Sequence, residues 1–348
     1  MLTQHDILEA LRAVRYPGYS RDVVSFGLVR NIAVNGGAVS VFFQLNGGNA
    51  EIARQIKSEA ESVLRAVKGV EQLHVEVAET PGAKAPAPAQ SAGGQSNRVP
   101  GIRRIVAVAS GKGGVGKSTV SANLACALRQ LGGAVGLLDC DIYGPSIPLM
   151  MGTRDKPTVS EAEKLVPPSS HGVKLMSMGF LIDDNAPVIW RGPMIVKTIQ
   201  QFIGDVEWGE LDYLLVDLPP GTGDAQLTLC QTVPLDGGVI VTTPQEASLG
   251  VVRKGIAMFE KLNVPILGII ENMSYYTTPT GERVEIFGHG GGKAEAERRK
   301  VPFLGEIPIF VEIRRGGDSG VPVVVSDTQA APAQAFIGIA KTLRAALG

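Results

Sequence analysis

The sequence has few cysteines, few aromatic residues and no long apolar run. Its three cysteines, Cys126, Cys140 and Cys230, are odd in number and far apart, which excludes a disulfide framework and a C-x-x-C metal knuckle. No apolar stretch approaches the roughly 20 residues that span a bilayer. The first residues also lack the basic and apolar parts of a secretory signal. We therefore expect a cytoplasmic protein without a membrane partner.

An excess of charge of either sign is also missing. The 348 residues include 33 basic and 34 acidic ones, so a formal net charge of −1 draws the chain neither to nucleic acid nor to anionic lipid. Hydrophobic residues make up 44% of the chain, which is enough to build a core and excludes disorder over most of its length. We expect a folded protein with more than one domain and no nucleic-acid partner.

The composition divides the chain into three parts. Residues 79–101 are rich in Pro, Ala, Gly, Ser and Gln, which is typical of a flexible linker. Residues 1–78 before it show the periodicity of a small α+β domain. Its expected order is helix, strand, strand, helix and strand, with a hairpin turn at Asn35-Gly36-Gly37 between the first two strands. After the first helix, the strands are expected at 23–32, 39–45 and 70–77 and the second helix at 50–67.

Residues 102–348 predict an α/β domain with a mostly parallel sheet flanked by helices. Short strands that are apolar throughout, and therefore covered on both faces, alternate with helical patterns. A last helix, 333–347, is expected to pack on the sheet. The strands are expected at 105–109, 134–138, 214–218, 239–242 and 266–270.

A phosphate-binding motif follows the first of these strands. The segment Gly111-Lys112-Gly113-Gly114-Val115-Gly116-Lys117-Ser118 matches G-x-x-x-x-G-K-[ST] between a strand and a helix, the context that the P-loop requires. The glycines let backbone N–H groups surround a polyphosphate, Lys117 reaches the β and γ phosphates, and Ser118 is a Mg²⁺ ligand. We expect ATP and Mg²⁺ as cofactors, bound by this segment together with Thr119.

Two acidic segments follow later strands of the predicted sheet. Asp139-Cys140-Asp141 ends one strand and Asp217 ends another, so both segments face the edge where parallel sheets bind ligands. Asp217 is expected to hold Mg²⁺ through water, and Asp141 to orient the attacking water. The catalytic set predicted for ATP hydrolysis is Lys112, Lys117 and Asp141.

Several segments together resemble a known family. The phosphate loop contains Lys112 in addition to Lys117. With this additional lysine it resembles the deviant Walker loop of the MinD, ParA and nitrogenase iron protein class. With Asp139-x-Asp141-Ile-Tyr-Gly-Pro-Ser, Asp217-Leu-Pro-Pro-Gly-Thr-Gly-Asp224, Thr243-Pro244-Gln245 and Glu271-Asn272-Met273-Ser274, the chain resembles the Mrp/ApbC ATPases, which are iron–sulfur cluster carriers. The first domain looks like the PaaD-like domain of many members.

The resemblance implies further properties. Lys112 would cross the interface of a homodimer to the partner's phosphates, Asn272 would contact the adenine base, and the partners would be iron–sulfur apoproteins or assembly factors. Family carriers hold a [4Fe–4S] cluster with a C-P-x-C segment shortly after Asn-Met-Ser, because such clusters need thiolate ligands. Here residues 274–281 contain no cysteine.

The remaining candidate ligands do not replace that motif. Cys126 and Cys230 are interpreted as buried apolar residues, and His171 and His289 as isolated loop residues. Cys140 is a single thiol, so two copies in a dimer supply only two of the four ligands that a cluster needs. The sequence therefore offers no identifiable cluster ligands, and a [4Fe–4S] cluster is implied by resemblance only. Our hypothesis is that the chain keeps the ATPase and the dimer without the family's cluster ligands.

Three functions remain open from the sequence. The first is an ATP-hydrolysing iron–sulfur cluster carrier or scaffold that assembles clusters or transfers them to apoproteins. The alternative is a nucleotide-dependent dimeric switch of the MinD/ParA kind without a bound cluster. A biosynthetic kinase or ligase on the same fold would need a base that positions an acceptor, and none can be distinguished from the switch residues.

Overall fold

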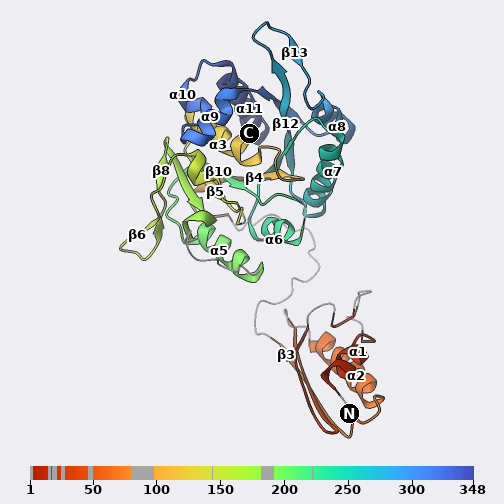
Figure 1. The fold of residues 1–348 in the computed structure, drawn as a ribbon. Helices are drawn as coiled ribbons and strands as arrows, with labels where there is room; N and C mark the ends of the chain where they lie inside the picture. The colour runs from red at the N-terminus through yellow and green to blue at the C-terminus, as the bar shows by residue number, and fades with distance from the viewer. Residues whose placement is uncertain are drawn as a thin grey trace. The chain divides into compact units, whose positions relative to one another are not determined.

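The computed structural model describes residues 3–14, 17, 22–24, 28–45, 50–79, 98–142, 144–181, 192–221 and 223–348. The chain forms two compact units, Met1–Gly94 and Gln95–Gly348, which are described separately below (Figure 1). Residues 80–97 of the expected linker, together with Tyr143 and Thr222 of the acidic segments, lie outside the described residues.

The first unit is a three-stranded sheet packed against two helices. Strand β2 pairs with β1 in an antiparallel and with β3 in a parallel arrangement, giving the order β1-β2-β3. Side chains from both helices and the sheet form its core, among them Ile7, Leu11, Phe43, Ile56 and Leu64. The α+β prediction is confirmed, with elements α1 (Gln4–Leu11), β1 (Val29–Asn35), β2 (Ala38–Leu45), α2 (Ala50–Arg65) and β3 (Gln72–Glu79).

One expected strand of this unit begins later than the alternating pattern suggested. Strand β1 starts at Val29, whereas Val23 and Val24 form a turn. The Val23 amide donates to the Val14 carbonyl at 2.9 Å, which ties this buried valine to the segment after α1. The prediction of a strand from Val23 was wrong because burial of an apolar residue does not require a ladder partner.

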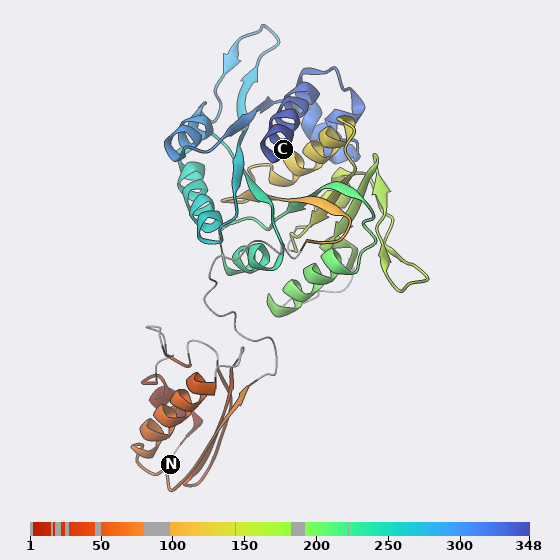
Figure 2. The ribbon, with the colours of Figure 1, turned by 180° about the vertical axis from the view of Figure 1, so that it is seen from behind.

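The second unit contains a mixed sheet with a parallel centre (Figures 1 and 2). Its order is β13-β12-β11-β4-β10-β5-β9-β8, with β14 also beside β12. Only the pairs β12–β13 and β8–β9 are antiparallel. The bounds are β4 (Ile102–Ser110), β5 (Val135–Asp139), β8 (Ser169–Ser170), β9 (Val173–Ser177), β10 (Leu211–Asp217), β11 (Gly237–Thr242), β12 (Ile266–Thr277), β13 (Arg283–Val284) and β14 (Phe303–Ile309); β6 (Thr158–Val159) and β7 (Leu165–Val166) pair separately.

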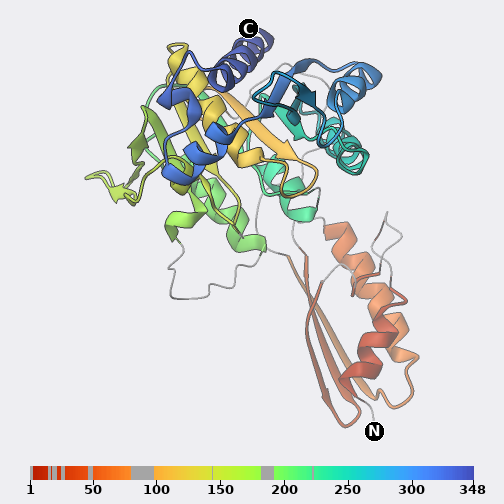
Figure 3. The same cartoon turned by 45° about the horizontal axis from the view of Figure 1, so that its top comes forward.

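Helices cover both faces of this sheet. On β4, Val106 and Val108 join the core that contains α3 (Lys117–Gln130) and α11 (Ala331–Leu347). Its residues Ile105, Ala107 and Ala109 join the core that contains α5 (Gly192–Gly204), α6 (Asp224–Thr232) and α7 (Glu246–Lys261). Figures 1 and 3 show α3 and α11 on the side of the sheet away from α5 and α6. Two covered faces explain strands that are apolar throughout.

The helices of the second unit complete the predicted α/β fold. Their bounds are α3 (Lys117–Gln130), α4 (Ile147–Met150), η1 (Met178–Leu181), α5 (Gly192–Gly204), α6 (Asp224–Thr232), α7 (Glu246–Lys261), α8 (Gly291–Arg299), α9 (Val311–Ser319), α10 (Val323–Ser326) and α11 (Ala331–Leu347). The closing helix α11 buries Phe336, Ile339 and Leu343, as predicted. Among the described residues, no helix combines the length and apolar character needed to cross a bilayer.

Candidate functional site

The phosphate loop lies between β4 and α3 and borders a cavity of about 180 Å³. All residues from Lys112 to Thr119 line this cavity, together with Ser110, Asp141, Ser146, Met150 and Pro220. No side chain caps the start of α3, so the backbone N–H groups of its first turn are available to an anion. The cavity therefore has the donors and the helix end that a polyphosphate requires.

A glycine conformation holds the end of this loop. Gly116 has φ +80°, and a Cβ there would lie 2.3 Å from Asn272 Nδ2. We expect Gly116→Ala to weaken ATP binding about ten-fold or more, because backbone strain and the clash displace the loop. Gly338→Ala in α11 is the matched control, since a Cβ at Gly338 meets nothing within 4 Å and this residue lies outside the loop. Equal nucleotide dissociation constants for the two variants, measured by calorimetry, would contradict the expectation.

Asp217 accepts hydrogen bonds from three side chains of α3, two of which, Lys117 and Ser118, line the cavity. Lys117 Nζ donates to Asp217 Oδ2 at 2.7 Å, and Ser118 Oγ donates to the same oxygen at 2.6 Å. Ser121 Oγ donates to the other carboxylate oxygen at 2.6 Å. Lys117 and Asp217 are buried. The structure thus brings together the lysine, the serine and the acid that the sequence predicted from separate motifs.

Ser121 is a residue of this site that sequence reasoning missed. It follows Lys117 by four residues, so both lie on the same face of α3, and this spacing was the available signal. The hydroxyl of Ser118 and the carboxylate of Asp217 are hard oxygen donors of the kind that Mg²⁺ prefers. The donor set therefore fits Mg²⁺.

Two aspartates after β5 have different positions. Asp139 is fully buried and accepts hydrogen bonds from the amides of Asp141 (3.0 Å) and Ile147 (3.2 Å) and from Ser177 Oγ (3.1 Å). Burial, with the nearby Asp217 charge, raises the pKa of Asp139 to about 7. Asp139 fastens the segment that carries Asp141, and Asp141 lines the cavity. The role of Asp141 toward water stays a prediction.

The other predicted loop residues lie around the same loop. Lys112 Nζ is 3.5 Å from Gln245 Oε1, and Lys112 lines the cavity. Gly111 does not line it but approaches α7 so closely that a Cβ would lie 2.7 Å from Val251. Asn272 is buried, and its Nδ2 donates to the Val115 carbonyl at 2.8 Å. Asn272 therefore supports the loop from behind, and its contact with a base stays a prediction.

The three cysteines are core residues, as interpreted from the sequence. All are buried, Cys126 in α3, Cys230 in α6 and Cys140 directly after β5. Burial raises the pKa of Cys126 and of Cys230 to about 12, and that of Cys140 well above its ordinary value. Iron is bound by thiolates, and burial disfavours the thiolate form. These residues do not fit the ligand set of an iron–sulfur cluster.

The interpretation of His289 as an isolated residue was wrong. Its Nε2 lies 2.7 Å from Glu306 Oε2, and ligand atoms of Glu271, His289 and Glu306 lie within 4.8 Å of one another. Buried Glu271 accepts from the amides of Gly290 and Gly292, which fastens the start of α8. Below the hairpin formed by β12 and β13, the contacts are therefore made by the imidazole of His289 and the carboxylates of Glu271 and Glu306.

The other histidine in question, His171, has one contact of its own. Its ring nitrogen Nε2 lies 2.9 Å from the Gly320 carbonyl.

Comparisons with known proteins agree with the fold. Residues 101–344 match the family model described as NUBPL iron-transfer P-loop NTPase, and residues 4–77 match that described as iron-sulfur cluster assembly protein. An iron-sulfur cluster carrier protein of Synechocystis is 46% identical, over 99% of this chain and 97% of its own length. The Helicobacter pylori protein of the same name is 41% identical, over 100% and 94%.

Solved structures resemble the second unit. A nucleotide-binding protein from Archaeoglobus fulgidus, solved with ADP, is 46% identical with a TM-score of 0.58, covering 64% of this chain and 88% of that one. The Pyrococcus furiosus cell division ATPase MinD has a TM-score of 0.54 at 23% identity, over 70% and 99%, which shows the shared fold alone. Both family models match this chain, and the two carrier proteins are similar to it over nearly their full length. The chain therefore belongs to the iron–sulfur cluster carrier protein family, with a P-loop NTPase domain.

Proposed function

We propose that this protein binds and hydrolyses ATP and takes part in assembling iron–sulfur clusters or transferring them to apoproteins. The observation that supports the ATPase is that Lys117 and Ser118, which line the phosphate cavity, both donate hydrogen bonds to the buried Asp217. Family membership and relatives named as cluster carriers support the role in clusters. We infer a small domain over residues 1–78, a linker over 79–101 and an ATPase domain over 102–348.

Each residue of the cavity has a place in this proposal. The loop amides and Lys117 bind the β and γ phosphates, and Ser118 and Asp217 hold Mg²⁺, which when bound neutralises phosphate charge. Lys117 exchanges its contact with Asp217 for the phosphates when nucleotide enters. Asp141 orients the attacking water. Lys112 acts on the nucleotide of a second subunit, so that the active form is a homodimer.

The cluster is the cargo of this ATPase and is not held by the chain's own thiolates. We expect protein purified without oxygen, and then incubated with iron and sulfide, to contain far less than one [4Fe–4S] cluster per dimer, because the three cysteines are buried and residues 274–281 contain none. Iron and acid-labile sulfide analysis measures this. A stable cluster with a charge-transfer band near stoichiometric loading would overturn the proposal.

A variant with all three cysteines replaced by alanine is the control for that measurement. Its iron and sulfide content is expected to equal that of the unmodified chain, because none of the three is an accessible ligand. A cluster that is present in the unmodified chain and lost in this variant would show that the chain's own cysteine thiolates bind the cluster.

The missing thiols also favour a second candidate function, a nucleotide-dependent dimeric switch that carries no metal. Asp141→Ala protein, expected to bind ATP without hydrolysing it, separates the two candidates in a pull-down. Recovery of iron–sulfur apoproteins or assembly factors supports the first function. Binding to anionic vesicles or DNA without such clients supports the second.

A further inference from the structure

A second cavity lies at the edge of the sheet opposite the phosphate loop. It has a volume of about 360 Å³ and is bordered by the first residues of β4, the last turn of α3 and the end of α11. Strand β4 begins here and ends at the phosphate loop, whereas α3 begins at the loop and ends here. The cavity is therefore separate from the phosphate cavity and joined to it by two rigid elements.

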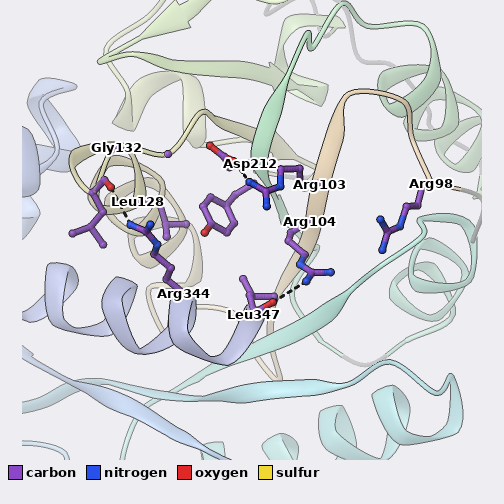
Figure 4. A pocket seen from close by; sticks show the side chains of 12 residues that line it. Arg98, Arg103, Arg104, Leu128, Gly132, Asp212, Arg344 and Leu347 are labelled. Carbon is purple, nitrogen blue, oxygen red and sulfur yellow. Dashed lines mark hydrogen bonds and ion pairs between the residues drawn. The ribbon is translucent and has the colours of Figure 1, made fainter.

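Four arginines line this cavity, here called the arginine pocket: Arg98, Arg103, Arg104 and Arg344. Figure 4 shows them on three separate segments, the stretch before β4, β4 itself and α11. One acidic side chain, Asp212, lines the pocket with them. Its carboxylate accepts a hydrogen bond from Arg103 Nη1 at 3.0 Å and one from the Ala134 amide at 2.9 Å. The lining is thus strongly cationic.

Half of these guanidinium groups form no ion pair in the described part of the chain, although Arg344, after the Ala134 amide and Arg103, helps to lower the pKa of Asp212. Arg104 pairs with Asp236 at 3.5 Å and donates to the Leu347 carbonyl at 2.9 Å. Arg344 donates only to the Leu131 carbonyl, at 3.1 Å, and no ion pair is found for it or for Arg98 among the described residues. Guanidinium groups that border a cavity and form no ion pair with a carboxylate can bind an oxyanion through paired N–H donors.

The adjoining linker cannot supply that anion. Residues 80–97, which directly precede Arg98, contain one charged residue, Lys84, and no acid. The pocket also has apolar walls from Leu128, Leu131 and the Tyr213 ring. A Cβ at Gly133 would lie 3.1 Å from that ring, so the glycine leaves room beside it. A cavity of this size, apolar on its walls and cationic on its rim, suits a small organic molecule.

We propose that the arginine pocket binds a small organic anion that carries phosphate or carboxylate groups. The oxyanion groups meet Arg98 and Arg344, and the carbon skeleton lies against Leu131 and Tyr213. The proposal does not depend on the ATPase or the cluster role, because every residue in it lies at the opposite edge of the sheet from the phosphate loop.

Calorimetry on the full chain tests this with two probes, inorganic pyrophosphate for the phosphate source and citrate for the carboxylate source. We expect at least one probe to bind the unmodified chain about ten-fold or more tightly than Arg98→Ala/Arg344→Ala, since each charged hydrogen bond is lost with its donor. The tighter probe identifies the source. The pyrophosphate titrations are fitted with two sites, because the phosphate loop also binds this probe, and only the site weakened in the double variant is assigned to the arginine pocket.

Two controls keep this test decisive. Arg315→Ala removes an exposed arginine of α9 away from the pocket and is expected to bind both probes like the unmodified chain. Arg98→Ala alone changes an exposed side chain, so it is expected to fold. It provides the comparison with the unmodified chain if the double variant unfolds. Equal affinity of the unmodified chain, Arg98→Ala and any folded double variant for both probes would overturn the proposal.

Discussion

Replacing Lys112 with alanine is expected to lower the rate of ATP hydrolysis by about 10³-fold and to leave nucleotide affinity nearly unchanged. The reason is that a cation supplied by a second subunit stabilises charge that develops only in the transition state. Within its own subunit, Lys112 Nζ contacts Gln245 rather than the carboxylate that holds Lys117. Steady-state kinetics with a separate binding measurement resolve the two effects.

A mixture of variants tests whether Lys112 acts across the dimer. Lys112→Ala and Asp141→Ala are each expected to be inactive alone. In a mixed dimer, one site combines an intact Asp141 with a lysine from the other subunit. Random pairing then restores about a quarter of the unmodified activity, since about half of the dimers have one complete site of two. A mixture as inactive as its components would show that the lysine does not act in trans.

Replacing Lys117 with alanine is expected to abolish measurable ATP hydrolysis and to lower the free energy of unfolding by about 3 kcal/mol. Asp217 is fully buried, and without Lys117 its charge has only the hydroxyls of Ser118 and Ser121 as partners. Denaturant unfolding measures the stability loss. Lys254→Ala, at an exposed position of α7, is the control and is expected to change neither quantity.

A second substitution separates the two effects of Lys117. Adding Asp217→Asn to Lys117→Ala removes the unpaired charge, so most of the lost stability returns while hydrolysis stays absent. A Lys117→Ala protein that hydrolyses ATP at the unmodified rate would contradict the assignment of this lysine. Unchanged stability in that variant would show that the buried ion pair contributes little to the resting fold.

The sequence predicted the parts of the site that depend on local order. The phosphate loop and Asp217 could be placed because each follows a strand that is apolar throughout, and parallel strands end at one edge. Ser121 was missed because α3 is buried on almost every side. The sequence of this helix therefore shows no separate polar face on which Ser121 would stand out. The contact of Asn272 with Val115 joins residues 157 positions apart and follows from no local pattern.

The grouping around His289 could not be predicted for a different reason. Glu271 lies on β12, His289 on the segment before α8 and Glu306 on β14. They meet because the pairing of β12 with β14 places Glu271 opposite Glu306. Sequence spacing gives the existence of these strands but not which of them are neighbours. The late start of β1 has a different origin, since the Val23 amide donates to the Val14 carbonyl in the nearby segment after α1.

The central position of β4 sets the order in which the chain can fold during synthesis. Its two neighbours, β10 and β11, are made more than a hundred residues later, so the strand that carries the phosphate loop leaves the ribosome without a partner. The first unit, whose three strands all precede residue 80, can fold in that interval. The nascent P-loop unit therefore exposes apolar strand edges until β10 is made, and we expect chaperones to bind it at that stage.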